Sequence, residues 1–162
     1  MFHCGVANLR VQIRMSDDEI AAFLDEPHKM QLASINADGT PHLATMYYAV
    51  VDGRLAFWTY RTSQKAVNLR RDPRVGCLVE AGERYDDFHG VSINGSVETI
   101  EDMAGVRDIG AAVYGRYLDG FGSDMVGYLD QQASKRNAYL VDADSTASWD
   151  HRKIAAALAG TS

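Results

Sequence analysis

Cysteine, proline and long apolar runs are all scarce in this sequence of 162 residues. The two cysteines, Cys4 and Cys77, form no disulfide framework, so we expect a protein of a reducing, cytoplasmic compartment. No apolar run approaches the roughly 20 residues that span a bilayer. Segment 1–14 carries Arg10 and Arg14 and lacks a continuous apolar stretch. We therefore expect neither a membrane partner nor a signal peptide.

Positive charge is also in short supply. Lysine and arginine number 16 against 22 aspartates and glutamates, a formal net charge of −6, which argues against a nucleic-acid partner. The cations are unevenly spread, because five of them fall between positions 61 and 74 beside a single acid. They are Arg61, Lys65, Arg70, Arg71 and Arg74. Such an island indicates either a small anionic ligand or a solvated helix face.

The chain has the length and composition of one ordinary globular domain. Residues 1–14 show no clear period and are expected to form an N-terminal extension, with the packed domain at 15–162. Periodicity predicts short helices at 16–26, 63–71, 101–119 and 124–132, and a tail at 148–159 that ends as an alanine-rich helix. It predicts strands at 30–36, 43–51, 54–60, 74–80, 88–100 and 136–144. Six strands in meander-like order, with helices outside, predict a mainly β fold built on an antiparallel barrel.

Local signals support several of these boundaries. Ser16 and Glu19 have the spacing of a capping box, and Asp52-Gly53 suits a tight hairpin turn. Asn94-Gly95 lies inside a strand and is expected to be a bulge. The 43–51 strand is apolar on both faces, which suits one face in the core and the other against a subunit or a planar ligand.

The most informative constellation runs from Trp58 to Pro73. Thr59 ends a strand, and Ser63 stands where the next helix should have its N-cap. Unpaired amides in the first turn of a helix, together with its dipole, favour an anion there. Lys65 lies in that same turn, where a cation opposes the dipole unless an anion lies between them. These residues therefore indicate a phosphate site.

At these residues the sequence resembles the pyridoxamine 5′-phosphate oxidase-like split-barrel superfamily. The shared pattern is an aromatic-Thr pair that ends a strand, a Ser-Gln-Lys that opens a helix, and an Asn-Leu followed by an Asp-Pro stop. The resemblance covers 16–100 and implies a six-stranded split β-barrel with a flavin-type cofactor. The residues that it implies for cofactor binding are Leu43, Thr45, Met46 and Tyr47 along the ring, Trp58 and Thr59 beside the ribityl phosphate, and Ser63, Gln64 and Lys65 on the phosphate. Gly90 stands where the oxidases carry a cofactor-contacting glutamine.

Two further segments point to a branch of that superfamily. Residues 68–74 (Asn-Leu-Arg-Arg-Asp-Pro-Arg) and the tail 149–153 (Trp-Asp-His-Arg-Lys) are similar to the branch that uses the deazaflavin coenzyme F420. The chain lacks the C-terminal arginine and histidine pattern with which true oxidases hold their substrate phosphate. The resemblance therefore implies F420, with FMN as the alternative cofactor, and not pyridoxamine phosphate oxidation.

The tail allows two interpretations. Trp149 to Lys153 could cap the barrel, with the indole in the core and the charges solvated. Alternatively, Trp149, His151 and Arg152 line the mouth of the cofactor pocket of a partner subunit. The five histidines and two cysteines show no metal-ligand spacing, so no metal site is expected.

Together these observations predict a homodimeric oxidoreductase that passes a hydride from reduced F420 to an unsaturated small organic acceptor. A barrel of this size cannot enclose a tricyclic cofactor alone, so the pocket is expected at a two-fold interface. No catalytic side chain is identified, because the reactive carbon belongs to the cofactor. The alternatives are an FMN-dependent oxidoreductase of the same fold and a non-catalytic carrier or sensor of the cofactor.

Overall fold

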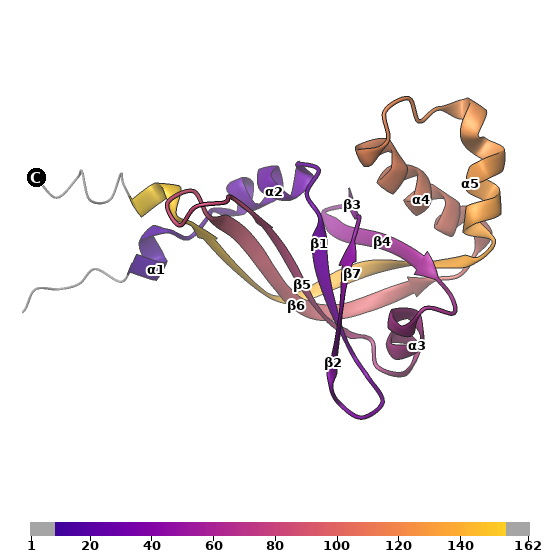
Figure 1. The fold of residues 1–162 in the computed structure, drawn as a ribbon, viewed down its shortest axis with the longest axis horizontal. Helices are drawn as coiled ribbons and strands as arrows, with labels where there is room; N and C mark the ends of the chain where they lie inside the picture. The colour runs from indigo at the N-terminus through magenta and orange to yellow at the C-terminus, as the bar shows by residue number, and fades with distance from the viewer. Residues whose placement is uncertain (1–8, 155–162) are drawn as a thin grey trace, which may run out of the picture.

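The computed structural model describes residues 9–154 and contains one curled antiparallel sheet of seven strands, with helices on its outside (Figure 1). The strands lie in the order β2-β1-β5-β6-β7-β4-β3. Their bounds are β1 Met30–Ile35, β2 Pro41–Met46, β3 Ala49–Val51, β4 Arg54–Tyr60, β5 Arg74–Ala81, β6 His89–Ile100 and β7 Arg136–Asp150. The mainly β, antiparallel barrel-like fold expected from the sequence is confirmed.

The count of six strands is wrong by one, because the single strand expected at 43–51 is interrupted at Tyr47 and Tyr48. Its first part, β2, pairs with β1, and its second part, β3, pairs with β4. These strands are the two edges of the sheet. A link of two residues spans only about 10 Å, so the sheet must curl until its edges approach each other. The interruption is what turns the sheet into a split barrel.

Strand β4 is buried on both faces and separates two apolar cores. Leu55 and Phe57 point into the barrel, where Phe57 stacks on Tyr139 with ring centroids 5.0 Å apart. Ala56 and Trp58 point outward into a second core beneath the helices α4 and α5. The alternation follows from the two-residue period of a strand. It makes β4 the wall shared by the barrel and the helical layer.

The helices are α1 Leu9–Gln12, α2 Asp17–Asp25, α3 Gln64–Arg71, α4 Met103–Tyr117 and α5 Val126–Ala133, with a 3₁₀ turn η1 at Ser123–Met125. Both bonds of the predicted capping box are present at Ser16 and Glu19. Asp52 and Gly53 have φ angles of 50° and 74°, as the predicted hairpin turn requires.

The last strand is longer than expected, because β7 follows its partner β6 to Asp150 rather than ending at 144. The pairing shifts at Asn94-Gly95, which confirms the predicted bulge. A Cβ on Gly95 would lie 2.0 Å from the carbonyl oxygen of Asp142, so only glycine allows this approach. Residues 148–150, expected to begin the tail, are therefore part of this strand. A helical turn follows at 152–154, and residues 155–159 lie outside the described part.

The described part of the N-terminal segment packs against the end of β7. The carbonyl of Ile13 accepts a hydrogen bond from the Asp150 amide at 2.7 Å, and Met15 is buried in the barrel core. Between residues 9 and 154 no helix is long and apolar enough to cross a membrane. Within the same range, no group of three His, Cys, Asp or Glu side chains is placed to hold a metal ion.

Candidate functional site

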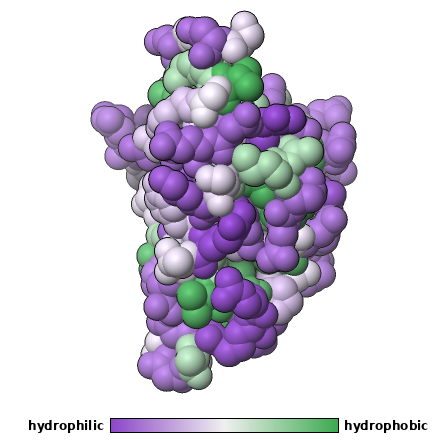
Figure 2. Space-filling view, turned by 90° about the vertical axis from the view of Figure 1, so that its right-hand side faces the viewer, coloured by the Kyte–Doolittle hydropathy of each residue, from purple (hydrophilic) through white to green (hydrophobic). Residues whose placement is uncertain are grey.

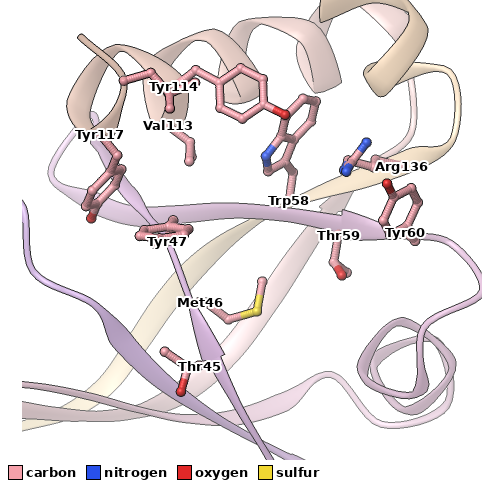
Figure 3. Close-up of a pocket in the computed structure, with 11 residues that line it drawn as sticks. Thr45, Met46, Tyr47, Trp58, Thr59, Tyr60, Val113, Tyr114, Tyr117 and Arg136 are labelled. Carbon is pink, nitrogen blue, oxygen red and sulfur yellow. The ribbon is translucent and has the colours of Figure 1, made fainter.

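A cavity of about 370 Å³ lies between the end of β2, the end of β4 and the overlying helix α4 (Figure 3). Five of the nine residues predicted to bind the cofactor line it, namely Thr45, Met46, Tyr47, Trp58 and Thr59. The structure adds residues that the sequence did not single out for the site. They are Tyr60, Val113, Tyr114, Tyr117, Leu118 and Arg136.

Helix α4 forms the roof of the cavity because its backbone rests directly on an indole ring. A Cβ on Gly110 would lie 2.5 Å from the ring of Trp58, so the helix can approach this closely only where it carries glycine. Tyr114, one turn further along, meets the same indole edge-on with centroids 5.2 Å apart. Burial raises the pKa of Tyr114 to about 12, and its neighbour Tyr128 contributes. Its hydroxyl therefore holds its proton at neutral pH.

The C-terminal end of α4 is fixed to the end of α2 and to the connection between α2 and β1. The Arg116 guanidinium donates to the carbonyl oxygens of Leu24 and Glu26, at 3.0 and 2.6 Å. The Tyr117 hydroxyl donates to the carbonyl of His28 at 2.5 Å. The ring of Tyr117 then packs against Tyr47, with centroids 4.7 Å apart. These contacts set the width of the cavity at the end nearest β2.

The predicted phosphate residues lie beside the cavity, at the start of α3. Thr59 Oγ1 and Ser63 Oγ are 3.2 Å apart, and Ser63 caps α3 by accepting from the Ala66 amide at 3.4 Å. Gln64 donates to Asn68 Oδ1 at 2.9 Å. Lys65 is half-buried, makes no ion pair within the described residues, and burial lowers its pKa. We call Thr59, Ser63, Gln64 and Lys65 the cradle.

The cradle is held in place from behind by a buried asparagine. Asn68 is fully buried, and its amide donates to Ser34 Oγ at 3.1 Å and to Asn36 Oδ1 at 3.0 Å. These bonds fix α3 to β1 and to the turn that follows it. The position of the first turn of α3 is thus set by the barrel, and Thr59 joins the cradle to the cavity.

The remaining predicted site residues lie elsewhere in the chain. Leu43 is on the outward face of β2, 71% exposed and away from the cavity. Trp149 and His151 line a second hollow beside α1, together with Arg10 and Val11. Helix α1 lies at the end of the sheet opposite α4 and α5 (Figure 1). The indole of Trp149 covers Gly90, where a Cβ would lie 2.6 Å from the ring. These side chains could reach a cofactor pocket only in another copy of the chain.

Several of the cations in the predicted island already have partners. Arg74 forms an ion pair with Asp72 at 2.7 Å and holds the pKa of that carboxyl at about 2. Arg71 donates to the carbonyl of Ile35, and Arg61 donates to Asn137 at 3.0 Å. In the tail, Arg152 pairs with Asp150 and Lys153 with Glu19. Within the described residues, Lys65 and Arg70 of the island form neither an ion pair nor a side-chain hydrogen bond.

Comparison with known proteins identifies relatives of this architecture. The sequence model of the pyridoxamine 5′-phosphate oxidase family matches residues 16–150. A pyridoxine/pyridoxamine 5′-phosphate oxidase from Cupriavidus taiwanensis is 31% identical over 96 residues, which is 55% of this chain and 41% of that protein. This chain thus matches less than half of the length of that relative.

Solved structures extend the comparison. A conserved hypothetical protein from Mycobacterium tuberculosis is 43% identical, with a TM-score of 0.86 over 90% of this chain and 91% of that one. A structure described as an F420 reductase is 21% identical, with a TM-score of 0.62 over 78% of this chain and 94% of that one. At that identity the likeness concerns the fold alone.

Proposed function

Because this chain belongs to the pyridoxamine 5′-phosphate oxidase family, a family of flavin-related oxidoreductases, we propose that its cavity and cradle together hold a phosphorylated flavin-type cofactor. The preferred cofactor is the deazaflavin F420, and FMN is the alternative. The reaction that we propose is hydride transfer from the reduced cofactor to an unsaturated small organic acceptor. The setting is a reducing cytoplasm, in keeping with the buried free thiol of Cys77.

The observation that carries this proposal is the position of Thr59. Its side chain lines the aromatic cavity and also lies 3.2 Å from the N-cap hydroxyl of α3. One continuous surface therefore offers an apolar slot for a planar ring and, next to it, hydroxyls, the N-terminus of a helix and a lysine that has no ion pair among the described residues. This donor set fits a phosphorylated tricyclic cofactor.

The chemistry supplied by the bound cofactor is hydride transfer, and the protein contributes position, dryness and charge. Trp58, Tyr114 and Tyr117 keep water from the slot and limit the tilt of a ring inserted between β2 and α4. Tyr114 holds a proton at neutral pH beside the slot, so it can serve as a hydrogen-bond donor to a bound acceptor. Lys65 and the first-turn amides of α3 neutralise phosphate charge at the other end.

The preference for F420 rests on the sequence pattern and on the cations near the cradle. F420 carries carboxylates beyond its phosphate, whereas FMN has none. Arg61 and Arg70 belong to the same cation island as Lys65, and both side chains are exposed and engage no carboxylate within the described residues. They suit an anionic tail that continues beyond the phosphate.

A second copy of the chain is part of the proposal. A cavity of about 370 Å³ lies near the lower end of the range for small-molecule sites, about 300–1,000 Å³, so a tricyclic cofactor with a phosphate tail needs further walls. Leu43 and Thr45 on β2 and Tyr47 just after it have exposed side chains. Thr45 and Tyr47 line the cavity, whereas Leu43 points away from it. By contrast, the face that carries α4 and α5 is mostly hydrophilic, with only small hydrophobic patches (Figure 2). We therefore place the partner against β2, where its Trp149 and His151 would close the pocket.

The test is a titration of the purified protein with F420 and with FMN, followed by absorbance, in wild type and in Thr59→Val. This substitution keeps the shape of the side chain but removes the hydroxyl that joins cavity and cradle. We expect binding by wild type and at least tenfold weaker binding by Thr59→Val. Absence of binding to both cofactors would refute the proposal. Tight binding without oxidation of F420H₂ by any acceptor of an unsaturated panel would favour the carrier alternative.

A further inference from the structure

One cation in the cavity has no role in the cradle. The guanidinium of Arg136 lies between two aromatic rings, 4.7 Å from the centroid of Trp58 and 3.9 Å from that of Tyr60 (Figure 3). The sheet register produces this arrangement, because Arg136 is paired directly with Tyr60 across β4 and β7. The partner of Trp58 is Ala138, whose small side chain leaves room for the arginine to lean across the indole.

The hydrogen bonds of Arg136 anchor one side of the guanidinium and leave the other side available. Nη1 donates to the carbonyl oxygen of Gln132 at 3.0 Å and also to the side-chain Oε1 of that residue. Nε and Nη2 donate to no acceptor among residues 9–154, and no carboxylate in that range lies within ion-pair distance. Other arginines of the chain, such as Arg54, Arg74 and Arg152, each pair with an acid.

The available edge has the geometry that a carboxylate requires. Nε and Nη2 of a guanidinium are parallel donors spaced to meet the two oxygens of one carboxylate. Stacking between two rings fixes the plane of the group, and the bonds to Gln132 fix its rotation, so little entropy remains to be lost on binding. A half-buried cation without an anionic partner is unfavourable until an anion arrives.

The cradle does not account for this cation. Thr59 lies between Trp58 and Tyr60 along β4 and points to the opposite face, toward Ser63. Arg136 is on the α4 side of the strand, with Trp58 and Tyr114 (Figure 3). This is the side on which we place the proposed acceptor.

We propose that Arg136 binds a carboxylate of the acceptor, which makes the acceptor an unsaturated carboxylic acid. This inference rests on the proposed function, since it assigns the substrate class of the same cavity. A carboxylate could also be supplied by the tail of F420, so the experiment separates the two sources.

The test compares an acid with its neutral amide on the cofactor-free protein. The probes are trans-cinnamate and cinnamamide, with affinities measured by ligand-observed NMR for wild type, Arg136→Gln, Arg136→Lys and the control Arg74→Gln. Arg74 is exposed and does not line the cavity. We expect wild type and Arg74→Gln to prefer the acid by about tenfold or more. Arg136→Gln should lose this preference, and Arg136→Lys, which keeps the charge without the fork, should lose most of it.

Two results would overturn the inference. One is an equal affinity of wild type for acid and amide. The other is an acid preference that persists in Arg136→Gln or, if that variant does not fold by its thermal melt, in Arg136→Lys. A parallel titration with F420 and FMN tests whether the carboxylate comes from the cofactor tail. An Arg136 variant that weakens F420 binding alone and leaves cinnamate binding unchanged would assign the residue to that tail. Failure of both cofactors to bind would instead refute the proposed function while the acid preference stands.

Discussion

Lys65 is expected to favour ligand binding at the expense of the stability of the free protein. It occupies the second position of α3, where the helix dipole disfavours a cation, and it is half-buried without an ion pair among the described residues. Burial also lowers the pKa of Lys65 below 10.5, because it disfavours the charged form of the amine. Lys65→Met keeps most of the apolar stem and removes the charge, so the two effects can be separated.

The substitution should weaken cofactor binding strongly and stabilise the free protein slightly. A charge-assisted hydrogen bond to phosphate contributes about 1.5–3 kcal/mol, so cofactor affinity should fall by about 10- to 150-fold. Removing a cation from the first turn of a helix relieves about 0.3–1 kcal/mol. The free protein should therefore melt at the same temperature as wild type or up to about 3 °C higher.

The pH dependence follows from the direction of the pKa shift. The folded-state pKa of Lys65 is lowered, so between that value and 10.5 the unfolded chain holds a proton that the folded chain releases. Stability therefore rises with pH across that window in wild type relative to Lys65→Met. Below the window both states are protonated and the difference between the two proteins is constant.

The assay combines cofactor titration with thermal melts of the free protein at several pH values. Lys29→Met is the control, because Lys29 is an exposed lysine outside the cavity and the cradle. A variant that binds both cofactors as wild type does would remove Lys65 from the phosphate site. A variant that melts several degrees lower without ligand would show that the lysine stabilises the free protein, contrary to the expected small destabilisation.

Three further outcomes are expected. Leu43→Arg should give a monomer in light scattering, because it puts a charge on the exposed face of β2; a persistent dimer would place the interface elsewhere. Gly110→Ala should lower the free energy of unfolding by about 1–3 kcal/mol, since its methyl would lie 2.5 Å from Trp58, whereas Gly115→Ala in open space should not, and equal effects would contradict the packing of α4. F420 affinity should fall more steeply with salt than FMN affinity, and equal slopes would favour FMN.

Features that depend on neighbouring residues could be predicted from the sequence. The capping box at Ser16 and Glu19, the Asp52-Gly53 turn and the Asn94-Gly95 bulge each depend on a few adjacent positions. The cradle is of the same kind, because the end of β4 and the first turn of α3 are contiguous in the chain.

The interruption at Tyr47 and Tyr48 could not be seen, because an apolar run indicates burial and not which strand it pairs with. Its cause is long-range. The Tyr48 side chain is fully buried, and its hydroxyl donates to the Leu24 carbonyl at 2.9 Å, so the residue is held in the core. The chain then leaves one sheet edge and joins the other. A hydrogen bond across 24 positions leaves no local pattern.

Unlike the cradle, the cavity is formed by residues that are far apart in the sequence. Its roof is formed by α4, which follows β4 by more than 40 positions and is placed by the contact of Gly110 with Trp58. The helical stripe could indicate that Val113 and Tyr117 are buried, but not against which surface. The position of Arg136 in the cavity depends on the register of β7 against β4, which no local sequence pattern indicates. The part of the site proposed to hold a phosphate is thus local and recognisable, whereas the part that would select the acceptor is assembled from distant segments. Chains that share the cradle can therefore differ in acceptor, and residues such as Arg136 are where we expect that difference to lie.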